Sequence, residues 1–359
     1  MPEGPEVKVI MSNMSDMLLG NTLVAVDVIN EGFQKRVKGF DKIKLPAVVN
    51  TVASKGKFGY IILDGGAAFG FAFGMTGNIR IEPTEAYLKH RKETREKYMK
   101  HCKVKFTYVL DDGTTTCFYY NSLRNFGTVN YLSAAELGKK LATLGPSILS
   151  DVALDKDALV VRWRRSTGNI CKTLIERQNL ISGIGNYIKA EILYRCAVDP
   201  RVDTTEVSDD DLYCLYLQAR EIAQDAYEDG GASLYTYTGI HGDKSEYKTK
   251  LQVYGKCKDP HGNTVETLKT PDKRTTHWVP AVQSAVKGVK GTKGTEDDSS
   301  EPQHVPALKI KIKTKLIKPI KPVIPVVPVK QVNSKPKLIL PVIRPSHPLI
   351  KVCRTKIAK

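Results

Sequence analysis

Apolar and polar residues follow two different patterns along the first third of the chain. From Val7 to Leu19 the apolar positions have helical spacing, and Gly20 ends the run. Short β-like runs then follow, and Asp111-Asp112-Gly113 between two of them is a hairpin signal. The runs cover residues 22–29, 48–53, 58–63, 67–73, 78–81, 102–110, 114–120 and 128–132. This pattern predicts an N-terminal helix attached to an eight-stranded β-sandwich or barrel over residues 2–132.

The apolar spacing becomes helical after residue 133, which predicts a second, helical domain over residues 133–245. Its expected helices are 134–143, 155–164, 169–178, 186–196 and 208–227. Short β signals return afterwards, so residues 246–283 are expected to form a compact hairpin-like unit. The chain as a whole is therefore predicted to be an α+β multidomain protein.

Charge is concentrated at the C-terminal end. Of the formal net charge of +17, residues 284–359 carry +13, from 17 basic and 4 acidic residues. This tail also holds 10 of the 19 prolines and no Phe, Tyr or Trp, which predicts a disordered basic tail. Such a tail either binds DNA phosphates or a protein, or is solvated without a specific role. The overall charge favours nucleic acid as partner.

Seven cysteines are scattered without any CxxC pair, which favours a reducing, intracellular compartment. The sequence shows neither a secretory signal nor an 18-residue apolar run, so we expect no membrane association. The lysine-rich tail leaves nuclear targeting open. We expect a monomer.

The first residues carry candidate chemistry. Removal of Met1 would leave Pro2 as a secondary amine, and an α-amine with a pKa of about 8 is partly nucleophilic at neutral pH. Glu3 and Glu6 follow and could move protons for such a nucleophile. The alternative is plain helix capping, because Pro and Glu both favour a helix N-terminus.

A second candidate site lies in the helical region. The Gly183-Ile184-Gly185 turn precedes a helix that begins near Asn186, a geometry that can hold a phosphate. Asn186 could add a donor and Lys172 a charge. The alternative is an ordinary connection between two helices.

Together these stretches resemble a known family. Pro2-Glu3-Gly4-Pro5-Glu6-Val7 is similar to the catalytic N-terminus of the formamidopyrimidine-DNA glycosylase/endonuclease VIII family. Residues 178–187, QNLISGIGNY, resemble that family's helix-two-turn-helix. The resemblance covers about residues 2–283 and implies a bifunctional DNA glycosylase and abasic-site lyase that excises oxidised bases from damaged single- or double-stranded DNA. A non-enzymatic DNA-binding or DNA-packaging protein is the alternative.

The resemblance also implies catalytic roles. Pro2 would attack C1′ of the damaged nucleotide, Glu3 would open the sugar ring and move protons, and Glu6 would be a supporting carboxylate. Lys57 would contact a phosphate beside the lesion, with Lys55 as the alternative bearer of that role.

Two further stretches resemble the family's DNA-intercalating loops. Gly74-Met75-Thr76-Gly77 would supply a void-filling Met75, and Leu123-Arg124-Asn125-Phe126-Gly127 would supply Arg124 and Phe126. These residue types suit the task, because Met adapts to an apolar gap and Phe can wedge a base step. The alternative places Met75 and Phe126 in the hydrophobic core.

The C-terminal hairpin departs from the family members that carry a four-cysteine zinc finger. Cys257, His261 and His277 do not form a convincing tetrahedral set. We therefore expect a zincless finger, without metal or other cofactor, in which Trp278 packing replaces the ion and Arg274 binds a phosphate. Residues 235–250 are either a mobile loop over the flipped base or a solvated linker.

Overall fold

The computed structural model describes residues 2–232 and 247–284. The tail predicted at 284–359, apart from Ser284, and residues 235–246 of the expected mobile loop lie outside the described residues. Residues 247–250 of that loop are described and form a 3-10 helix in which Tyr247 is buried.

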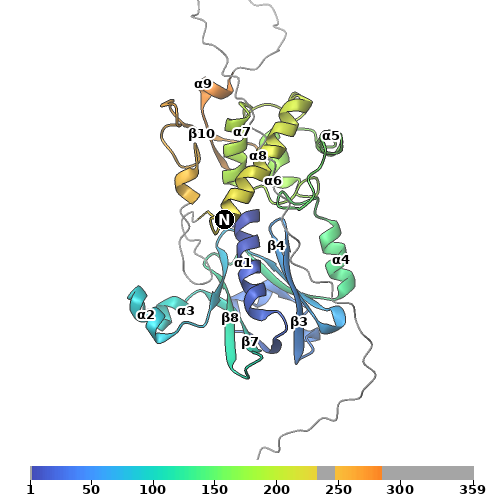
Figure 1. Ribbon diagram of the computed structural model, residues 1–359, viewed down its shortest axis with the longest axis vertical. Coiled ribbons are helices and arrows are strands. Elements are labelled where there is room, and N and C mark those ends of the chain that lie inside the picture. The colour runs from blue at the N-terminus through green and yellow to red at the C-terminus, as the bar shows by residue number, and fades with distance from the viewer. Residues whose placement is uncertain (1, 233–246, 285–359) are drawn as a thin grey trace, which may run out of the picture. The chain divides into compact units, whose positions relative to one another are not determined.

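The N-terminal part is a β-sandwich with one long helix against it, as predicted (Figure 1). Helix α1 spans Gly4–Leu18 and buries Val7, Ile10, Met11, Met14 and Leu18. The described strands of the sandwich pair in the order β2-β9-β5-β4-β3-β1-β7-β8-β6. They are β1 (Thr22–Val28), β2 (Val37–Lys38), β3 (Ala47–Lys55), β4 (Phe58–Leu63), β5 (Ala68–Ala72), β6 (Gly77–Ile81), β7 (Cys102–Val109), β8 (Thr115–Ser122) and β9 (Thr128–Leu132).

The two halves of the sheet face each other across an aromatic core. The halves are joined by a short antiparallel pairing of β1 with β3, at Thr22↔Val48 and Leu23↔Ala47. Phe69 on β5 meets Phe106 on β7 edge to face, with ring centroids 5.2 Å apart. Such contacts between inner faces define a sandwich.

The structure adds one strand and two α-helices to the predicted pattern of this part, besides short 3-10 helices at Glu31–Arg36, Phe40–Lys42 and Asp64–Gly66. Strand β2 has two residues and is too short to leave an alternation in the sequence, so the sheet has nine strands where eight were expected. Two short helices, α2 (Glu85–Arg91) and α3 (Arg95–Met99), lie between β6 and β7. Each is capped by a threonine, Thr84 or Thr94, whose hydroxyl accepts a backbone N–H.

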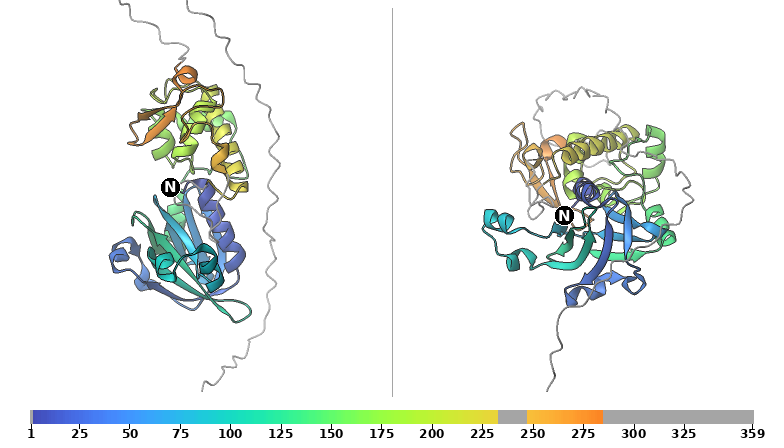
Figure 2. Two further views of the ribbon diagram at one scale, coloured as in Figure 1. Left: turned by 90° about the vertical axis from the view of Figure 1, so that its left-hand side faces the viewer. Right: turned by 60° about the horizontal axis from the view of Figure 1, so that its bottom comes forward.

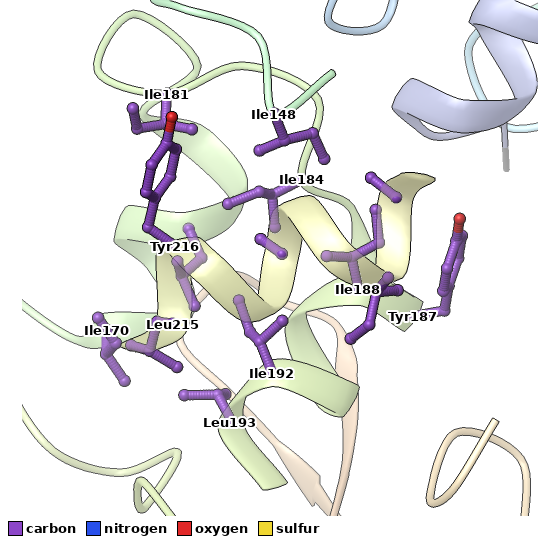
Figure 3. Packing of buried hydrophobic residues seen from close by; sticks show 14 of the residues in the cluster. Ile148, Ile170, Ile181, Ile184, Tyr187, Ile188, Ile192, Leu193, Leu215 and Tyr216 are labelled. Carbon is purple, nitrogen blue, oxygen red and sulfur yellow. The ribbon is translucent and has the colours of Figure 1, made fainter. Parts of the chain in front are cut away.

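The helical part confirms the predicted helices to within one or two residues. They are α4 (Ala134–Ala142), α5 (Lys156–Trp163), α6 (Ile170–Glu176), α7 (Asn186–Arg195) and α8 (Asp209–Glu228). Figure 3 shows apolar residues of α7, among them Ile188 and Ile192, in one cluster with Leu215 of α8. All three side chains are fully buried, so α7 is part of the hydrophobic core of the helical domain.

A hairpin follows this helical core. Strands β10 (Glu266–Lys269) and β11 (Thr275–Trp278) pair antiparallel, from Glu266↔Trp278 to Lys269↔Thr275. The short helix α9 (Pro280–Gln283) comes after it. Val253 and Val279 pack with Ala190 of α7, so the hairpin rests on the same helix that begins at the predicted phosphate site.

Candidate active site and DNA interface

The N-termini of α1 and α7 meet at Glu3. The carboxylate of Glu3 accepts the backbone N–H of Tyr187 at Oε1 (2.9 Å) and that of Ile188 at Oε2 (3.4 Å). Glu3 is also the N-cap of α1, and the preceding Pro2 is buried. The structure thus brings the chain's first residues against the predicted helix-two-turn-helix, where a carboxylate complements two helix N-termini.

Two glycines allow this close approach. A Cβ atom on Gly185 would overlap the carboxylate of Glu3. A Cβ atom on Gly56, in the turn between β3 and β4, would lie 2.7 Å from the side chain of Ser182. The absence of a side chain at both positions lets the β3–β4 turn, the start of α1 and the start of α7 converge.

The β3–β4 turn carries Lys57 to Glu3. Burial lowers the pKa of Lys57 to about 8, and attraction to Glu3 opposes that shift. Burial raises the pKa of Glu3, and the charge of Lys57 with the N–H donors of α7 opposes that shift. A lysine whose pKa is lowered to about 8 and a carboxyl whose pKa is raised are the kinds of group that general acid–base chemistry uses.

Glu6 joins three segments in the same buried cluster. Its Oε2 accepts the backbone N–H of Glu3 at 2.7 Å, and its Oε1 accepts the Tyr187 hydroxyl (3.1 Å) and the N–H of Ala232 (2.7 Å). Burial and the neighbouring Glu3 raise the pKa of Glu6 to about 7. The capping role considered for Glu6 is present, together with contacts to the helical core that capping alone does not need.

The two candidate lysines of the β3–β4 region point to different places. Lys55 donates its ammonium to the carbonyl of Leu141 at 2.9 Å, whereas Lys57 interacts with Glu3. The ammonium at the site is thus that of Lys57. Lys172, on α6, is half exposed and lies 4.0 Å from Glu176 in a surface ion pair.

Asn186 connects the start of α7 to the hairpin. Its amide donates to the carbonyl of Thr275 at 3.0 Å, and its buried Oδ1 has no hydrogen-bond partner among the residues that the structure describes. Thr275 follows Arg274, and the charge of Arg274 contributes to lowering the pKa of Lys57. The hairpin turn therefore brings its arginine toward the same site.

The predicted intercalating residues lie on two adjacent exposed loops. Met75 is 43% exposed and Phe126 is 54% exposed, so the alternative that placed them in the core is wrong. The backbone N–H of Arg124 donates to Thr76 Oγ1 at 3.1 Å, and Arg124 Nη1 lies 3.9 Å from Met75 Sδ. Leu123 is 48% exposed on the same loop, which gives the loops a third large apolar side chain.

The hairpin is held by a buried ion pair that the sequence pattern did not reveal. Lys189 Nζ of α7 lies 2.8 Å from Asp272 Oδ2 in the hairpin turn, and both side chains are completely buried. Asp272 also accepts the hydroxyl of Thr270, which in turn contacts Thr276 Oγ1 at 2.8 Å. Sequence reasoning treated position 189 as one residue of a helix, because a mid-helix lysine is usually solvent-exposed.

The hairpin was expected to lack a four-cysteine zinc site, and the positions of its candidate ligands bear on that expectation. Cys257 is exposed, and the ring of His277 packs on Tyr254 with centroids 4.9 Å apart. Within residues 2–232 and 247–284, no group of three His, Cys, Asp or Glu side chains is arranged to hold a metal ion. The described side chains of the hairpin are thus not gathered into a set of zinc ligands. Trp278 is buried, and the Arg201 guanidinium lies 4.9 Å from its ring centre.

One cysteine pair departs from the sequence expectation. Cys196 at the end of α7 and Cys214 on α8 form a disulfide, although their spacing of 18 residues matched no recognisable framework. Packing of α7 on α8 brings the two together, which spacing along the chain cannot show. In the part of the chain that is described, no helix is long and apolar enough to cross a membrane.

Sequence comparisons place these features in a family. Three models match in order: the formamidopyrimidine-DNA glycosylase N-terminal domain at residues 1–129, its H2TH domain at 144–238 and its C-terminal domain at 239–284. The formamidopyrimidine-DNA glycosylase of Lactococcus lactis subsp. cremoris is 27% identical over 296 residues, covering 79% of this chain and 99% of that protein.

Solved structures agree with this assignment. The crystal structure of the MutM (Fpg) protein of Thermus thermophilus has a TM-score of 0.65 at 26% identity, covering 79% of this chain and 99% of its own. The Lactococcus lactis Fpg in complex with DNA containing an abasic site has a TM-score of 0.67 at 22% identity, with the same coverage, and shares the fold. The three family models match in order, and the structure places Glu3 against the start of α7 in the H2TH segment. The chain therefore belongs to the formamidopyrimidine-DNA glycosylase family.

Proposed function

We propose that this chain is a bifunctional DNA glycosylase and abasic-site lyase that acts through the amine of Pro2. The observation that carries the proposal is the cluster in which the buried carboxylates of Glu3 and Glu6, with the partly exposed Lys57 nearby, lie next to Pro2 at the start of α7. A protein that only binds DNA does not need ionisable groups buried around its first residue, because burial of such groups costs free energy.

The proposed chemistry begins with attack of the Pro2 nitrogen on C1′ of the damaged nucleotide. The bond from C1′ to the base breaks, and the base leaves with a proton in exchange for the one that the Pro2 nitrogen gives up. Glu3 then supplies a proton to the ring oxygen, the C1′–O4′ bond breaks, and a cationic imine (iminium) to Pro2 forms. The imine acidifies the adjacent C2′ position, so loss of a C2′ proton expels the 3′ phosphate and cuts the strand. The raised pKa of Glu3 suits a group that first donates and then accepts a proton.

Lys57 and Arg274 are proposed to hold phosphates beside the lesion. Both are cations, and the charge of Arg274 reaches Lys57 across the site. Asn186 and Lys172 would add contacts on the helix-two-turn-helix. Charged contacts of this kind fix the register of DNA without reading its sequence.

The exposed loops provide the proposed means of opening the duplex. A base inside a duplex must leave the stack before its C1′ can react, and something must fill the gap. Met75 and Phe126 can fill it with apolar surface, and Arg124 can hydrogen-bond the orphan base. Oxidised pyrimidines, ring-opened purines and further-oxidised guanine products are the proposed substrates.

We propose further that the hairpin is a zincless finger of the endonuclease VIII-like type. The support for this proposal is that side-chain contacts hold the hairpin in place, a task that a metal ion performs in a zinc finger. The buried Lys189–Asp272 pair fixes the turn, and the carboxylate of Asp259 accepts the Tyr194 hydroxyl at 3.0 Å. Stoichiometric zinc in the purified protein would contradict this assignment.

Borohydride trapping tests the proposed chemistry. Duplexes that carry one oxidised base or an abasic site are incubated with the native chain, with Pro2→Thr, and with a chain that retains an N-terminal tag. A covalent adduct that forms only with the native N-terminus supports the imine mechanism and identifies the lesion class. Intact DNA binding without an adduct on any substrate would favour the non-enzymatic alternative, a DNA-binding or packaging protein.

A further inference from the structure

The segment between β6 and β7 carries an unusual share of the positive charge. Residues 84–101, here called the basic arm, contain six Lys and Arg and three Glu, a net charge of +3. Residues 1–283 together carry only +4, from 38 basic and 34 acidic residues. Most of the net positive charge outside the C-terminal tail therefore belongs to this arm of 18 residues.

The arm is fixed to the edge of the sandwich. Tyr98 is 5% exposed, and its hydroxyl donates to the carbonyl of Ile81 at 3.1 Å. The guanidinium of Arg80 stacks 4.5 Å from the centre of the Tyr98 ring and donates to the Tyr98 carbonyl. Because Arg80 and Ile81 belong to the edge strand β6, these contacts attach the arm to that edge of the sheet.

The ion pairs found in the arm involve its two arginines, and its lysines are exposed to solvent. Arg95 pairs with Glu82 at the end of β6, and Arg91 lies 3.6 Å from Glu93. The four lysines of the arm are all exposed: Lys89, Lys92, Lys97 and Lys100. A charged surface presented on a fixed scaffold loses little conformational freedom when it binds.

The register of the strands places the end of the arm beside the intercalating loops. The carbonyl of His101 accepts the backbone N–H of Ser122 at 2.9 Å, and Ser122 pairs with Gly77 at the start of β6. Ser122 lies two residues before Arg124, and Gly77 two residues after Met75. The C-terminal end of the arm, at His101, thus lies at the same end of the β6–β8–β7 ladder as the Met75 and Arg124 loops, whereas the arm begins at the other end of β6, where the N–H of Glu82 donates to the carbonyl of Cys117.

The positive charge around His101 and the position of α2 and α3 are both consistent with a basic surface near the intercalating loops. Burial and the charges of Lys103, Lys100 and Arg80 lower the pKa of His101. In Figure 1 and in the right-hand view of Figure 2, α2 and α3 project on the side where the β10–β11 hairpin also lies, and α4 lies on the other side in Figure 1.

We propose that the basic arm is an additional phosphate-binding surface, which contacts the DNA backbone next to the nucleotide extruded at the Met75 and Arg124 loops. The inference rests on the proposed function, because it needs DNA to lie across those loops. Its ligand is the sugar–phosphate backbone, so it adds affinity without sequence preference.

Salt dependence of binding tests the arm in the full-length chain. Binding to a duplex with a tetrahydrofuran abasic-site analogue is measured by fluorescence anisotropy across a series of salt concentrations. Each lysine that neutralises a phosphate contributes about 0.9 to the slope of log affinity against log salt. Replacing Lys89, Lys92, Lys97 and Lys100 together by Gln is expected to lower the magnitude of that slope by about 0.9 for each of them that contacts a phosphate, up to about 3.6 in all.

Two controls separate charge at the arm from charge in general. Replacing the same four lysines by Arg keeps the charge and is expected to keep the slope. The single change Lys97→Gln is compared with Lys139→Gln, which removes another exposed lysine, from α4. Only Lys97→Gln is expected to lower the slope.

The outcomes distinguish the arm from the chemistry. An unchanged slope in the four-Gln variant, or equal losses from Lys97→Gln and Lys139→Gln, would overturn the arm proposal. Borohydride trapping at saturating protein is expected to be the same for the four-Gln variant and the native chain. Absence of a Pro2-dependent adduct in the native chain would refute the proposed function, whatever the slopes show.

Discussion

The buried Lys189–Asp272 pair makes a sharp prediction about how the hairpin is held. Both side chains are completely buried, and Nζ and Oδ2 lie 2.8 Å apart. Asp272→Asn would preserve the shape and the contact with the Thr270 hydroxyl but leave the Lys189 ammonium without its counter-charge. Breaking a buried pair on one side typically costs about 3–5 kcal/mol. That is a large part of the roughly 5–15 kcal/mol by which a domain is stable.

A double-mutant cycle measures this coupling. Lys189→Met and Asp272→Asn are each expected to lower the free energy of unfolding by about 3 kcal/mol or more. The double variant removes both charges, so its loss is expected to be well below the sum of the two single losses. Urea unfolding followed by fluorescence provides the free energies, and protease sensitivity near residues 266–278 reports on the hairpin itself.

The reasoning would be refuted by two results. Single losses below about 1 kcal/mol would mean that water or an alternative partner satisfies the remaining charge. Additive losses in the double variant would mean that the two side chains act separately. A matched control is Lys156→Met with Asp210→Asn, a pair at 2.6 Å on the surface, for which the effect is expected to be small.

Three further predictions concern the site. The pKa of Lys57 is about 8, so phosphate contact by its ammonium should weaken as the pH rises through 8; cleavage measured against pH should fall there, and Lys57→Arg should extend the alkaline range. The folded-state pKa of Glu6, about 7, exceeds its ordinary value, so the folded state binds more protons and stability should fall by about 3 kcal/mol as the pH rises from about 4.5 to 7. Glu6→Gln should flatten this dependence in urea unfolding, and an equally steep curve in that variant would exclude Glu6 as its source. Leu123→Ala should lower excision from duplex DNA, on the order of tenfold, with little effect on single-stranded DNA, because only a duplex leaves a gap to fill; equal losses on both substrates would contradict a wedge role.

Several features of the site followed from local sequence. The helix at the N-terminus and the five helices after residue 133 were predicted because their apolar spacing is regular over two or more turns. Glu3, Met75, Arg124 and Phe126 were selected through short motifs that resemble a family. Each of these motifs spans only a few consecutive residues, so a single sequence was enough to select them.

Other features needed the folded chain. The sequence could not choose between Lys55 and Lys57, because the two are neighbours in one turn region and only packing sends the first to Leu141 and the second to Glu3. Helices α2 and α3 were missed because each has seven residues or fewer, too short for a clear helical period.

The sequence by itself determined the fold class, the order of the longer helices and strands, and the residue types available for chemistry, because these depend on local periodicity and on motifs of a few residues. Tertiary structure alone decided which of those residues meet. Glu3 reaches Tyr187, Lys189 reaches Asp272 and Cys196 reaches Cys214 across 184, 83 and 18 residues respectively. Such partners are selected by the packing of helices and turns around shared cores, a global property that local spacing does not encode.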